Sequence, residues 1–270
     1  MVLYPFAYNI YVSFTNMSVY HIRNPAWVGL ANYVFVVTSP DFLTVLWNSV
    51  VWTLANVIPT VLIGLVLAFV LNSKVRGKTI YRLFMIVPWA MPSFITLLVW
   101  QSMYSTQYGV INALLGQVGI APINWLNDCN WAFVAIVVAN IWLGYPFMMI
   151  IFSGALQSIP NELYEAAAID GAVGFRQMRY ISIPLIKPTI MVAVLLGSIW
   201  TFNNFNAAYL ITGGGPGLCT TILITQAYKE AFNGTFAFAQ AATYACLAFV
   251  ILFVPGILWN RRTGLTRRAS

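Results

Sequence analysis

Charged side chains are scarce in this sequence. They make up 7% of the 270 residues, whereas 60% of the residues are hydrophobic. A water-soluble domain carries roughly a quarter charged residues, so a soluble fold is excluded and the chain is expected to lie in a membrane. The net charge of +7 does not indicate nucleic-acid binding, because the basic residues lie between long apolar runs.

Histidine, cysteine and acidic residues are also few. His21 is the only histidine and the three cysteines form no CxxC pair, which excludes a Cys/His metal site. The six acidic residues do not cluster with a nucleophile, so an integral-membrane enzyme is not expected. No acidic residue lies in an apolar run, where it could serve as a proton or sodium site, and this argues against an ion-coupled secondary transporter. Whether Cys129 and Cys219 pair stays open, because nothing in the sequence brings their two loops together.

Five apolar runs are long enough to cross a bilayer, which takes about 20 residues. They cover residues 45–71, 80–101, 131–152, 189–211 and 236–259. A sixth run, 1–14, is too short and has no signal-peptide cleavage site, so we interpret it as the outer half of a first crossing whose beginning is missing. The prediction is an all-α integral membrane protein with six transmembrane helices, the first one truncated, in a single domain over residues 1–270.

Lysine and arginine indicate the direction of these crossings. Eleven of the 13 basic residues follow the second, fourth and sixth crossings, and only Arg23 and Lys229 lie on the opposite side. Basic residues concentrate in cytoplasmic loops, so we expect a bacterial plasma-membrane protein with a cytoplasmic C-terminus. The eleven residues are Lys74, Arg76, Lys78, Arg82, Arg176, Arg179, Lys187, Arg261, Arg262, Arg267 and Arg268.

The cytoplasmic loop over residues 154–187 has helical signals of its own. Pro160 and Glu162 suit the first turn of a helix, and the alanines that follow are strong helix formers. Gly171 is a natural stop. The pattern predicts a helix, a glycine bend, and a second short helix over about 174–180 that ends before Pro184.

The same loop carries a recognisable motif. Glu165-Ala166-Ala167, Gly171 and Ile181-Ser182-Ile183-Pro184 have the spacing of the EAA loop of ABC-importer permeases, with Ile183 where leucine is usual. The resemblance implies the type I importer permease fold. It also implies that residues 154–187 form a cytoplasmic coupling loop that docks on a separate ATPase. The implied contact residues are Glu165, Ala166, Ala167, Asp170, Gly171 and Arg176.

Other stretches resemble the carbohydrate-uptake permeases, in particular the larger permease subunit of maltose/maltodextrin importers. They are residues 27–33, 142–146, 155–160, 202–205 and 210–216. The resemblance covers essentially the whole chain.

Two helix faces offer a sugar site. Helical spacing places Leu143, Gly144 and Phe147 on one face of the fourth crossing. It also predicts one face of the fifth crossing for a second set: Gly197, Trp200, Thr201 and Asn204. Aromatic rings suit the C–H face of a sugar, and amide and hydroxyl groups suit its hydroxyls. The alternative that these residues only pack helices together stays open, above all for Gly197 and Thr201.

The resemblance therefore implies the transmembrane permease subunit of an ATP-driven importer for maltose, maltodextrin or a related α-glucoside. The alternative is an importer of another neutral or phosphorylated polyol, such as glycerol 3-phosphate, although the only basic residue within the crossings is Arg82, near the beginning of the third. The chain is not expected to be an enzyme or to bind a cofactor, because ATP and Mg belong to the partner ATPase. The implied partners are a second homologous permease subunit, a homodimer of the ATPase and an extracytoplasmic sugar-binding protein.

Overall fold

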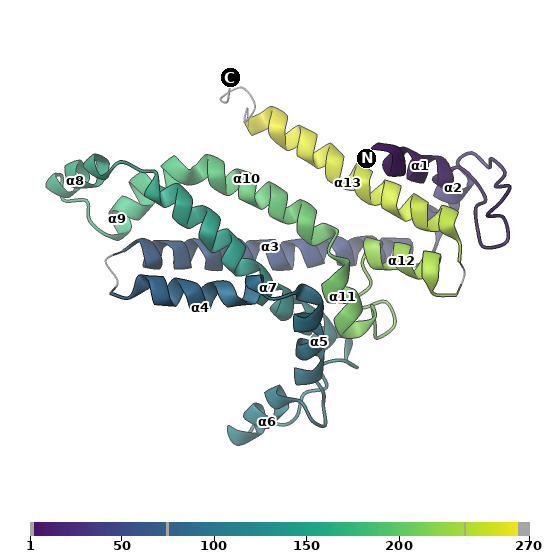
Figure 1. The fold of residues 1–270 in the computed structure, drawn as a ribbon, viewed down its shortest axis with the longest axis horizontal. Coiled ribbons are helices and arrows are strands. Elements are labelled where there is room, and N and C mark those ends of the chain that lie inside the picture. The colour runs from purple at the N-terminus through teal and green to yellow at the C-terminus, as the bar shows by residue number, and fades with distance from the viewer. Residues whose placement is uncertain (1–2, 74–75, 235, 264–270) are drawn as a thin grey trace. The chain divides into compact units, whose positions relative to one another are not determined.

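A computed structural model describes residues 3–73, 76–234 and 236–263, and these ranges are helical without any β-strand (Figure 1). The prediction of an all-α protein is confirmed. The helices are α1 (Leu3–Ser13), α2 (Ala31–Thr38), α3 (Phe42–Asn72), α4 (Lys78–Ala90), α5 (Ser93–Met103), α6 (Val110–Gln117), α7 (Cys129–Gln157), α8 (Asn161–Ile169), α9 (Phe175–Gln177), the π-helical turn η1 (Met178–Ser182), α10 (Ile183–Phe202), α11 (Phe205–Thr212), α12 (Leu223–Phe232) and α13 (Phe238–Thr263).

The chain divides into two compact units. Unit 1 takes its residues from 1–53, 97–136 and 202–270, and unit 2 consists of residues 54–96 and 137–201. The long helices α3 and α7 contribute residues to both units. The single domain over 1–270 stays a prediction.

Three helical stretches of the described residues are long and apolar enough to cross a membrane by themselves. They are α3, α7 and the continuous stretch Phe175–Phe202. The predicted crossings 45–71 and 131–152 are thus confirmed as α3 and α7. The described apolar part of α13, Phe238–Val254, is shorter, and α1 has 11 residues. Lys74, Arg267 and Arg268 lie outside the described residues.

The predicted third crossing, 80–101, is wrong as a single helix. It consists of α4 and α5, which together pass the test for a span but bend by 90° at the break between them. Met91 is extended at this break, with φ −81° and ψ 143°. The ring of Pro92 clashes with a helical conformation of the residue before it, so the helix ends where the proline requires.

The prediction that the second short helix ends before Pro184 is also wrong. The short helix α9 runs through η1 into α10, and Pro184 lies in the first turn of α10. Proline lacks the N–H that would continue the α-helical hydrogen bonds. A single π-helical turn accommodates such an irregularity without ending the helix. The second short helix and the fifth crossing therefore form one continuous helical rod, Phe175–Phe202.

Unit 2 is built on a close contact between α3 and α7. Gly64 of α3 approaches so closely that a Cβ atom there would lie 2.5 Å from Cβ of Met148 and 2.9 Å from the backbone nitrogen of Met149. A buried hydrogen bond, 2.9 Å from Asn140 Nδ2 to Asn56 Oδ1, joins the same helices. Small residues and polar pairs are the usual means of joining membrane helices.

Unit 1 is arranged around α13, which packs against α1, α2 and α12. The buried side chains of Phe42, Leu223 and Tyr244 belong to one core cluster there. The backbone N–H of Leu223 donates to Oγ of Ser49 at 2.8 Å, which fixes the start of α12 on α3. The loop before α12 is thereby anchored to a long helix.

Replacing Gly64 by alanine tests the α3–α7 contact. We expect Gly64→Ala to lower the free energy of unfolding by about 1–3 kcal/mol, because the new methyl group meets backbone and Cβ atoms that cannot move easily. The measurement is thermal unfolding of the purified protein in detergent. Gly154→Ala, also on a long helix but with no atom within 4 Å of its added Cβ, is the matched control and should unfold no earlier than wild type. Equal stability of both variants would contradict the contact.

Candidate functional site

Helix α8 ends in a cap that requires glycine. Gly171 has a φ of +76°, which residues with a Cβ rarely adopt. The N–H of Ala172 donates to the carbonyl of Ala167 at 2.8 Å, and the N–H of Gly171 to that of Ala168 at 3.1 Å. These two bonds are those of a Schellman motif. The predicted stop of the helix at Gly171 is confirmed.

The predicted ATPase-contact residues lie on α8 and on the segment that follows it. Five of the six are exposed and Ala167 is half-buried; the exposed ones are Glu165, Ala166, Asp170, Gly171 and Arg176. Tyr164, in contrast, binds to neighbouring residues of the same chain. Its hydroxyl forms a 2.9 Å hydrogen bond with Oγ of Ser182, and its carbonyl accepts one of 2.9 Å from Gln177. These bonds, which the sequence did not predict, attach α8 to α9 and η1, the beginning of the helical rod that continues as α10.

An aromatic cluster forms at the predicted sugar-binding face in unit 2. The rings of Phe147 on α7 and Trp200 on α10 lie 5.0 Å apart between centroids, so the two predicted faces do meet. Trp89 of α4 extends the cluster, 6.2 Å from Phe147. Trp200 and Trp89 are 57% and 52% exposed. Trp89 was missed because no partner face could be assigned to the third crossing, although its position just before the Met91-Pro92 break was a usable signal.

The two glycines of these faces make room for neighbouring helices. A Cβ atom on Gly197 would lie 2.7 Å from Cε of Met148, and one on Gly144 would lie 3.3 Å from Cγ2 of Thr60. Leu143 and Thr201 are half-buried beside them. Gly144 and Gly197 therefore leave room for Thr60 and for the end of the Met148 side chain, and the two tryptophans of the aromatic cluster are exposed.

Asn204 does not share a helix face with Trp200, so that part of the prediction is wrong. Helix α10 ends at Phe202, and Asn204 is extended, with φ −78° and ψ 92°, immediately before α11. Asparagine side chains compete for backbone hydrogen bonds and favour helix ends. The Asn203-Asn204 pair therefore interrupts the predicted crossing 189–211.

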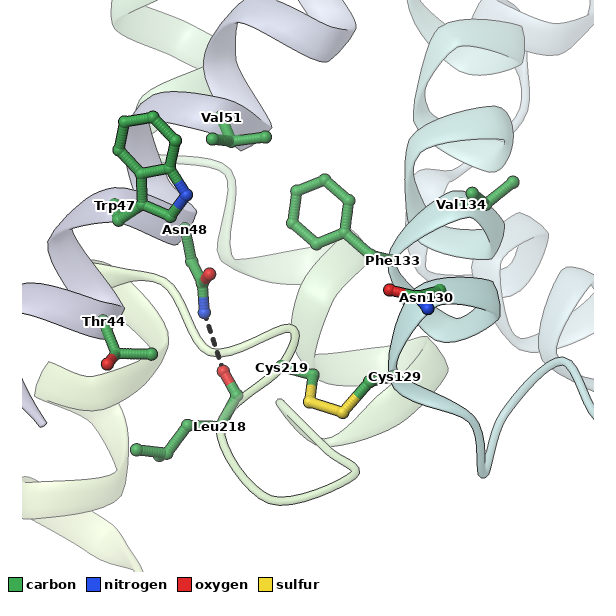
Figure 2. A pocket seen from close by; sticks show the side chains of 10 residues that line it. All are labelled: Thr44, Trp47, Asn48, Val51, Cys129, Asn130, Phe133, Val134, Leu218 and Cys219. Carbon is green, nitrogen blue, oxygen red and sulfur yellow. Dashed lines mark hydrogen bonds between the residues drawn. A yellow bond between two sulfur atoms is a disulfide. The ribbon is translucent and has the colours of Figure 1, made fainter.

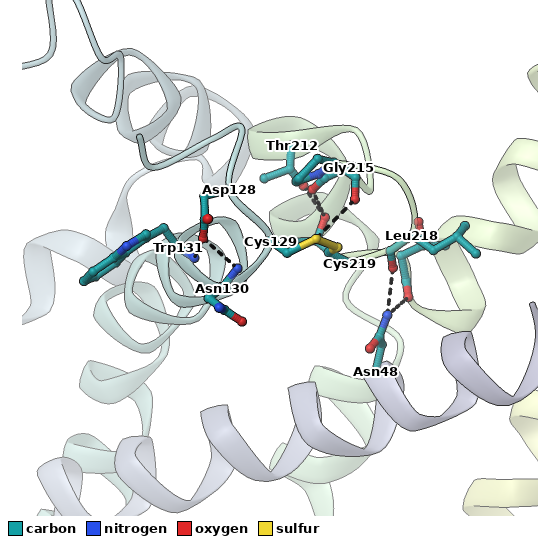
Figure 3. Close-up of a disulfide and its surroundings, with 12 residues drawn as sticks. Asn48, Asp128, Cys129, Asn130, Trp131, Thr212, Gly215, Leu218 and Cys219 are labelled. Atoms are coloured by element: carbon teal, nitrogen blue, oxygen red, sulfur yellow. Dashed lines mark hydrogen bonds between the residues drawn. A yellow bond between two sulfur atoms is a disulfide. The ribbon is translucent and has the colours of Figure 1, made fainter. Parts of the chain in front are cut away.

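A disulfide joins Cys129 to Cys219 in unit 1 (Figure 3). The sequence placed Cys129 in a loop, but the structure shows it as the first residue of α7. The Asp128 carboxylate caps this helix by accepting from the N–H groups of Asn130 (3.0 Å) and Trp131 (3.1 Å). The disulfide thus ties a capped helix end to the loop between α11 and α12, an arrangement that the cysteine spacing alone could not reveal.

That loop is further fixed by hydrogen bonds. Asn48 of α3 donates to the carbonyls of Leu218 (2.8 Å) and Thr221 (3.2 Å). Figure 3 shows the bond to Leu218. The ammonium group of Lys229 donates to Oγ1 of Thr221 at 3.0 Å, and burial lowers the pKa of Lys229. In the described ranges no three His, Cys, Asp or Glu side chains gather where they could hold a metal ion.

Apolar spanning helices, an exposed glycine-capped helix after α7 and an aromatic cluster between helices define a membrane-embedded transport subunit. The chain belongs to the family of binding-protein-dependent transport system inner membrane components, whose sequence model matches residues 60–262. The family consists of permease subunits rather than enzymes, which confirms the prediction made from the EAA loop.

Curated relatives with similar sequences are sugar permeases. The galactooligosaccharides transport system permease protein GanP of Bacillus subtilis is 36% identical over 97% of this chain and 66% of its own length. The trehalose/maltose permease MalF of Thermococcus litoralis is 35% identical over 86% of this chain and 79% of its own. The maltose/maltodextrin permease MalF of Salmonella typhimurium is 36% identical over 83% of this chain and 47% of its own length. The chain thus spans just under two thirds of the first relative and about half of the third.

Solved structures with the same fold are ABC importers. A bacterial alginate ABC transporter, crystallised with a periplasmic protein that holds an alginate pentasaccharide, matches with a TM-score of 0.83 over 96% of this chain and 87% of that one, at 21% identity. The MetNI methionine transporter matches with a TM-score of 0.60 over 83% and 97%, at 18% identity. These likenesses concern the fold, and the predicted type I importer permease fold is confirmed.

The cap of α8 can be tested by its demand for a positive φ. We expect Gly171→Ala to destabilise the last turn of α8 by about 1 kcal/mol, because a Cβ disfavours the left-handed conformation. Amide hydrogen exchange at Gly171 and Ala172 should become about fivefold faster as a result. Gly171→Asn should restore most of the protection, since asparagine tolerates this conformation. Equal protection in wild type and Gly171→Ala would contradict the assignment of the cap.

Proposed function

We propose that the chain is the transmembrane permease subunit of an ATP-driven importer that takes up a neutral oligosaccharide, with maltose, maltodextrin or a related α-glucoside as the leading candidate. The observation that carries the proposal is the aromatic cluster of Trp89, Phe147 and Trp200, whose two tryptophans are exposed, in a chain whose relatives are named as sugar permeases. Aromatic surface between helices is what recognition of a sugar ring requires. The relative named for galactooligosaccharides widens the candidates to other neutral oligosaccharides.

The proposed substrate site combines this cluster with the other predicted residues. Phe147 and Trp200 supply stacking surface, Leu143 flanks Phe147, and Thr201 supplies a hydroxyl. Gly144 and Gly197 set the spacing of the helices that carry the rings. None of these side chains is charged. A phosphorylated polyol such as glycerol 3-phosphate would favour basic residues instead, so it remains the second candidate.

The proposed partners follow from the loop around α8. Glu165, Ala166, Ala167, Asp170, Gly171 and Arg176 form the surface that docks on the ATPase, within the coupling loop 154–187. The exposure of these residues and the small alanines, which allow close approach, support this role. ATP and Mg are bound by a homodimer of that ATPase. A second homologous permease and an extracytoplasmic sugar-binding protein complete the importer.

The proposed orientation places the C-terminus and α8 in the cytoplasm. The distribution of lysine and arginine supports it, and the disulfide supports it independently. Disulfides persist in oxidising compartments outside the cytoplasm. Cys129 begins α7, whereas α8 follows the other end of α7, about 43 Å away for a helix of 29 residues. The disulfide end is therefore the extracytoplasmic end.

Transport then depends on a difference in affinity between two conformations. ATP closes the ATPase dimer, α8 moves with it, and the sugar site opens to the outside to receive sugar from the binding protein. A ligand or partner shifts the equilibrium toward the conformation that it binds better. The permease therefore needs no catalytic residue of its own.

Thiol labelling tests the orientation. In a Cys246→Ala background, we expect Gly116→Cys to react with a membrane-impermeant maleimide in intact cells and Ser270→Cys to be protected until the cells are opened. Gly116 lies at the end of α6, which the proposal puts outside. The reverse pattern of labelling would overturn both the topology and the cytoplasmic position of α8.

Transport by the reconstituted importer tests the function and its site. We expect ATP-dependent uptake of maltose, maltotriose, trehalose or galactobiose by proteoliposomes, and no uptake of glycerol 3-phosphate. Trp200→Ala should reduce sugar uptake by about tenfold through loss of stacking surface, while ATP hydrolysis stimulated by the binding protein persists because α8 is unchanged.

The matched control is Ile199→Ala, one residue earlier and turned by about 100° around the helix. It should transport at nearly the wild-type rate. Uptake of glycerol 3-phosphate alone would favour the second candidate. Equal losses of uptake and of assembly in both variants would mean that Trp200 is structural.

A further inference from the structure

A cleft in unit 1 contains none of the residues predicted to bind the sugar. It has a volume of about 540 Å³ and lies between the beginning of α3, the beginning of α7 and the disulfide-bonded loop before α12 (Figure 2). This volume is within the range of roughly 300–1,000 Å³ that is usual for small-molecule sites. All of its lining residues belong to unit 1.

Two aromatic rings line the cleft from different helices. Trp47 extends from α3 and is 67% exposed, and Phe133 extends from α7 (Figure 2). An exposed tryptophan that lines a cleft offers a flat apolar surface, and a second ring across from it can limit a ligand to flat shapes. The C–H faces of a pyranose ring have this shape and this polarity.

The polar groups of the cleft are neutral amides and a hydroxyl. Asn130, Asn48 and Thr44 line it, and its lining contains no charged side chain. Asn48 uses its amide hydrogens for Leu218 and Thr221, and Figure 2 shows its oxygen beside the cleft, where it can accept from a ligand hydroxyl. Such a set suits the hydroxyl groups of an uncharged ligand and disfavours an anion or an ammonium group.

The walls of the cleft are held in place before any ligand arrives. The disulfide fixes the loop to α7, the Asn48 hydrogen bonds fix it to α3, and Asp128 caps α7. A preorganised site loses little conformational freedom on binding.

We propose that this cleft is an outer subsite that holds one or two units of a neutral oligosaccharide, stacked on Trp47 and Phe133, when the sugar enters from the extracytoplasmic side. The inference rests on the proposed function for the identity of the ligand and for the side of the membrane. Trp47 and Phe133 retain the sugar during transfer, so that each closure of the ATPase delivers it rather than losing it to the outside.

The test measures sugar uptake per ATP hydrolysed in proteoliposomes that contain the complete importer. We expect Trp47→Ala and Phe133→Ala to lower this ratio by about three- to tenfold, with stimulation of ATP hydrolysis by the binding protein unchanged. Trp131→Ala is the matched control: Trp131 is an exposed tryptophan two residues from Phe133, packs on Trp125 and does not line the cleft. It should keep the wild-type ratio.

A second measurement identifies the occupant directly. Trp47 is replaced by p-benzoylphenylalanine, which keeps an aromatic ring, and the complex is illuminated with radiolabelled maltotriose. We expect label on this chain, and none when Trp131 carries the same replacement. Cross-linking to lipid or to the second permease instead of the sugar would overturn the proposal, as would a wild-type ratio in both cleft variants.

The outcomes separate this inference from the proposed function. If wild-type importer takes up no neutral oligosaccharide, the proposed function itself fails and the subsite falls with it. If uptake is normal in wild type and in both cleft variants, the function stands and only the subsite is wrong. Loss of stimulated ATP hydrolysis in the cleft variants would make the cleft a docking surface for the binding protein and contradict the proposal.

Discussion

Unit 2 depends on how closely α3 can approach α7. In a bilayer, burial of apolar surface does not favour helix association, so close packing and interhelical hydrogen bonds must supply the stability. Gly64 allows the approach, since a Cβ there would overlap Met148, and the Asn56–Asn140 bond fixes the same pair of helices. Because this contact sets the rotation of α7, it also determines where Phe147 lies.

One helical rod, Phe175–Phe202, connects the proposed sugar site to the proposed coupling surface. Trp200 lies on α10, which continues without a break from η1. Tyr164 joins α8 to α9 through Gln177 and to η1 through Ser182. A movement of α8 is thus applied to the rod that carries Trp200, beside Phe147 on α7. The irregular turn η1 is what allows Pro184 to lie within this rod instead of ending it.

The sequence predicts the features that depend on local chemistry. Long apolar runs identify α3 and α7, and a glycine after an alanine run identifies the cap of α8. The sequence does not predict where α10 ends, because the apolar run continues past the break at Asn203-Asn204. Continuous hydropathy also concealed the bend at Met91-Pro92, although the proline indicated a possible end of the helix. The Cys129–Cys219 bond and the position of Trp89 depend on contacts between distant segments, which no local pattern contains.

The central claim is that a neutral sugar binds against the aromatic cluster of unit 2. The most direct measurement is a structure of the assembled importer, trapped with a non-hydrolysable ATP analogue and with maltotriose loaded from the binding protein. We predict sugar density stacked within about 4 Å of the rings of Phe147 and Trp200. Sugar density remote from both rings, with the rings packed only on each other and on Trp89, would contradict the account.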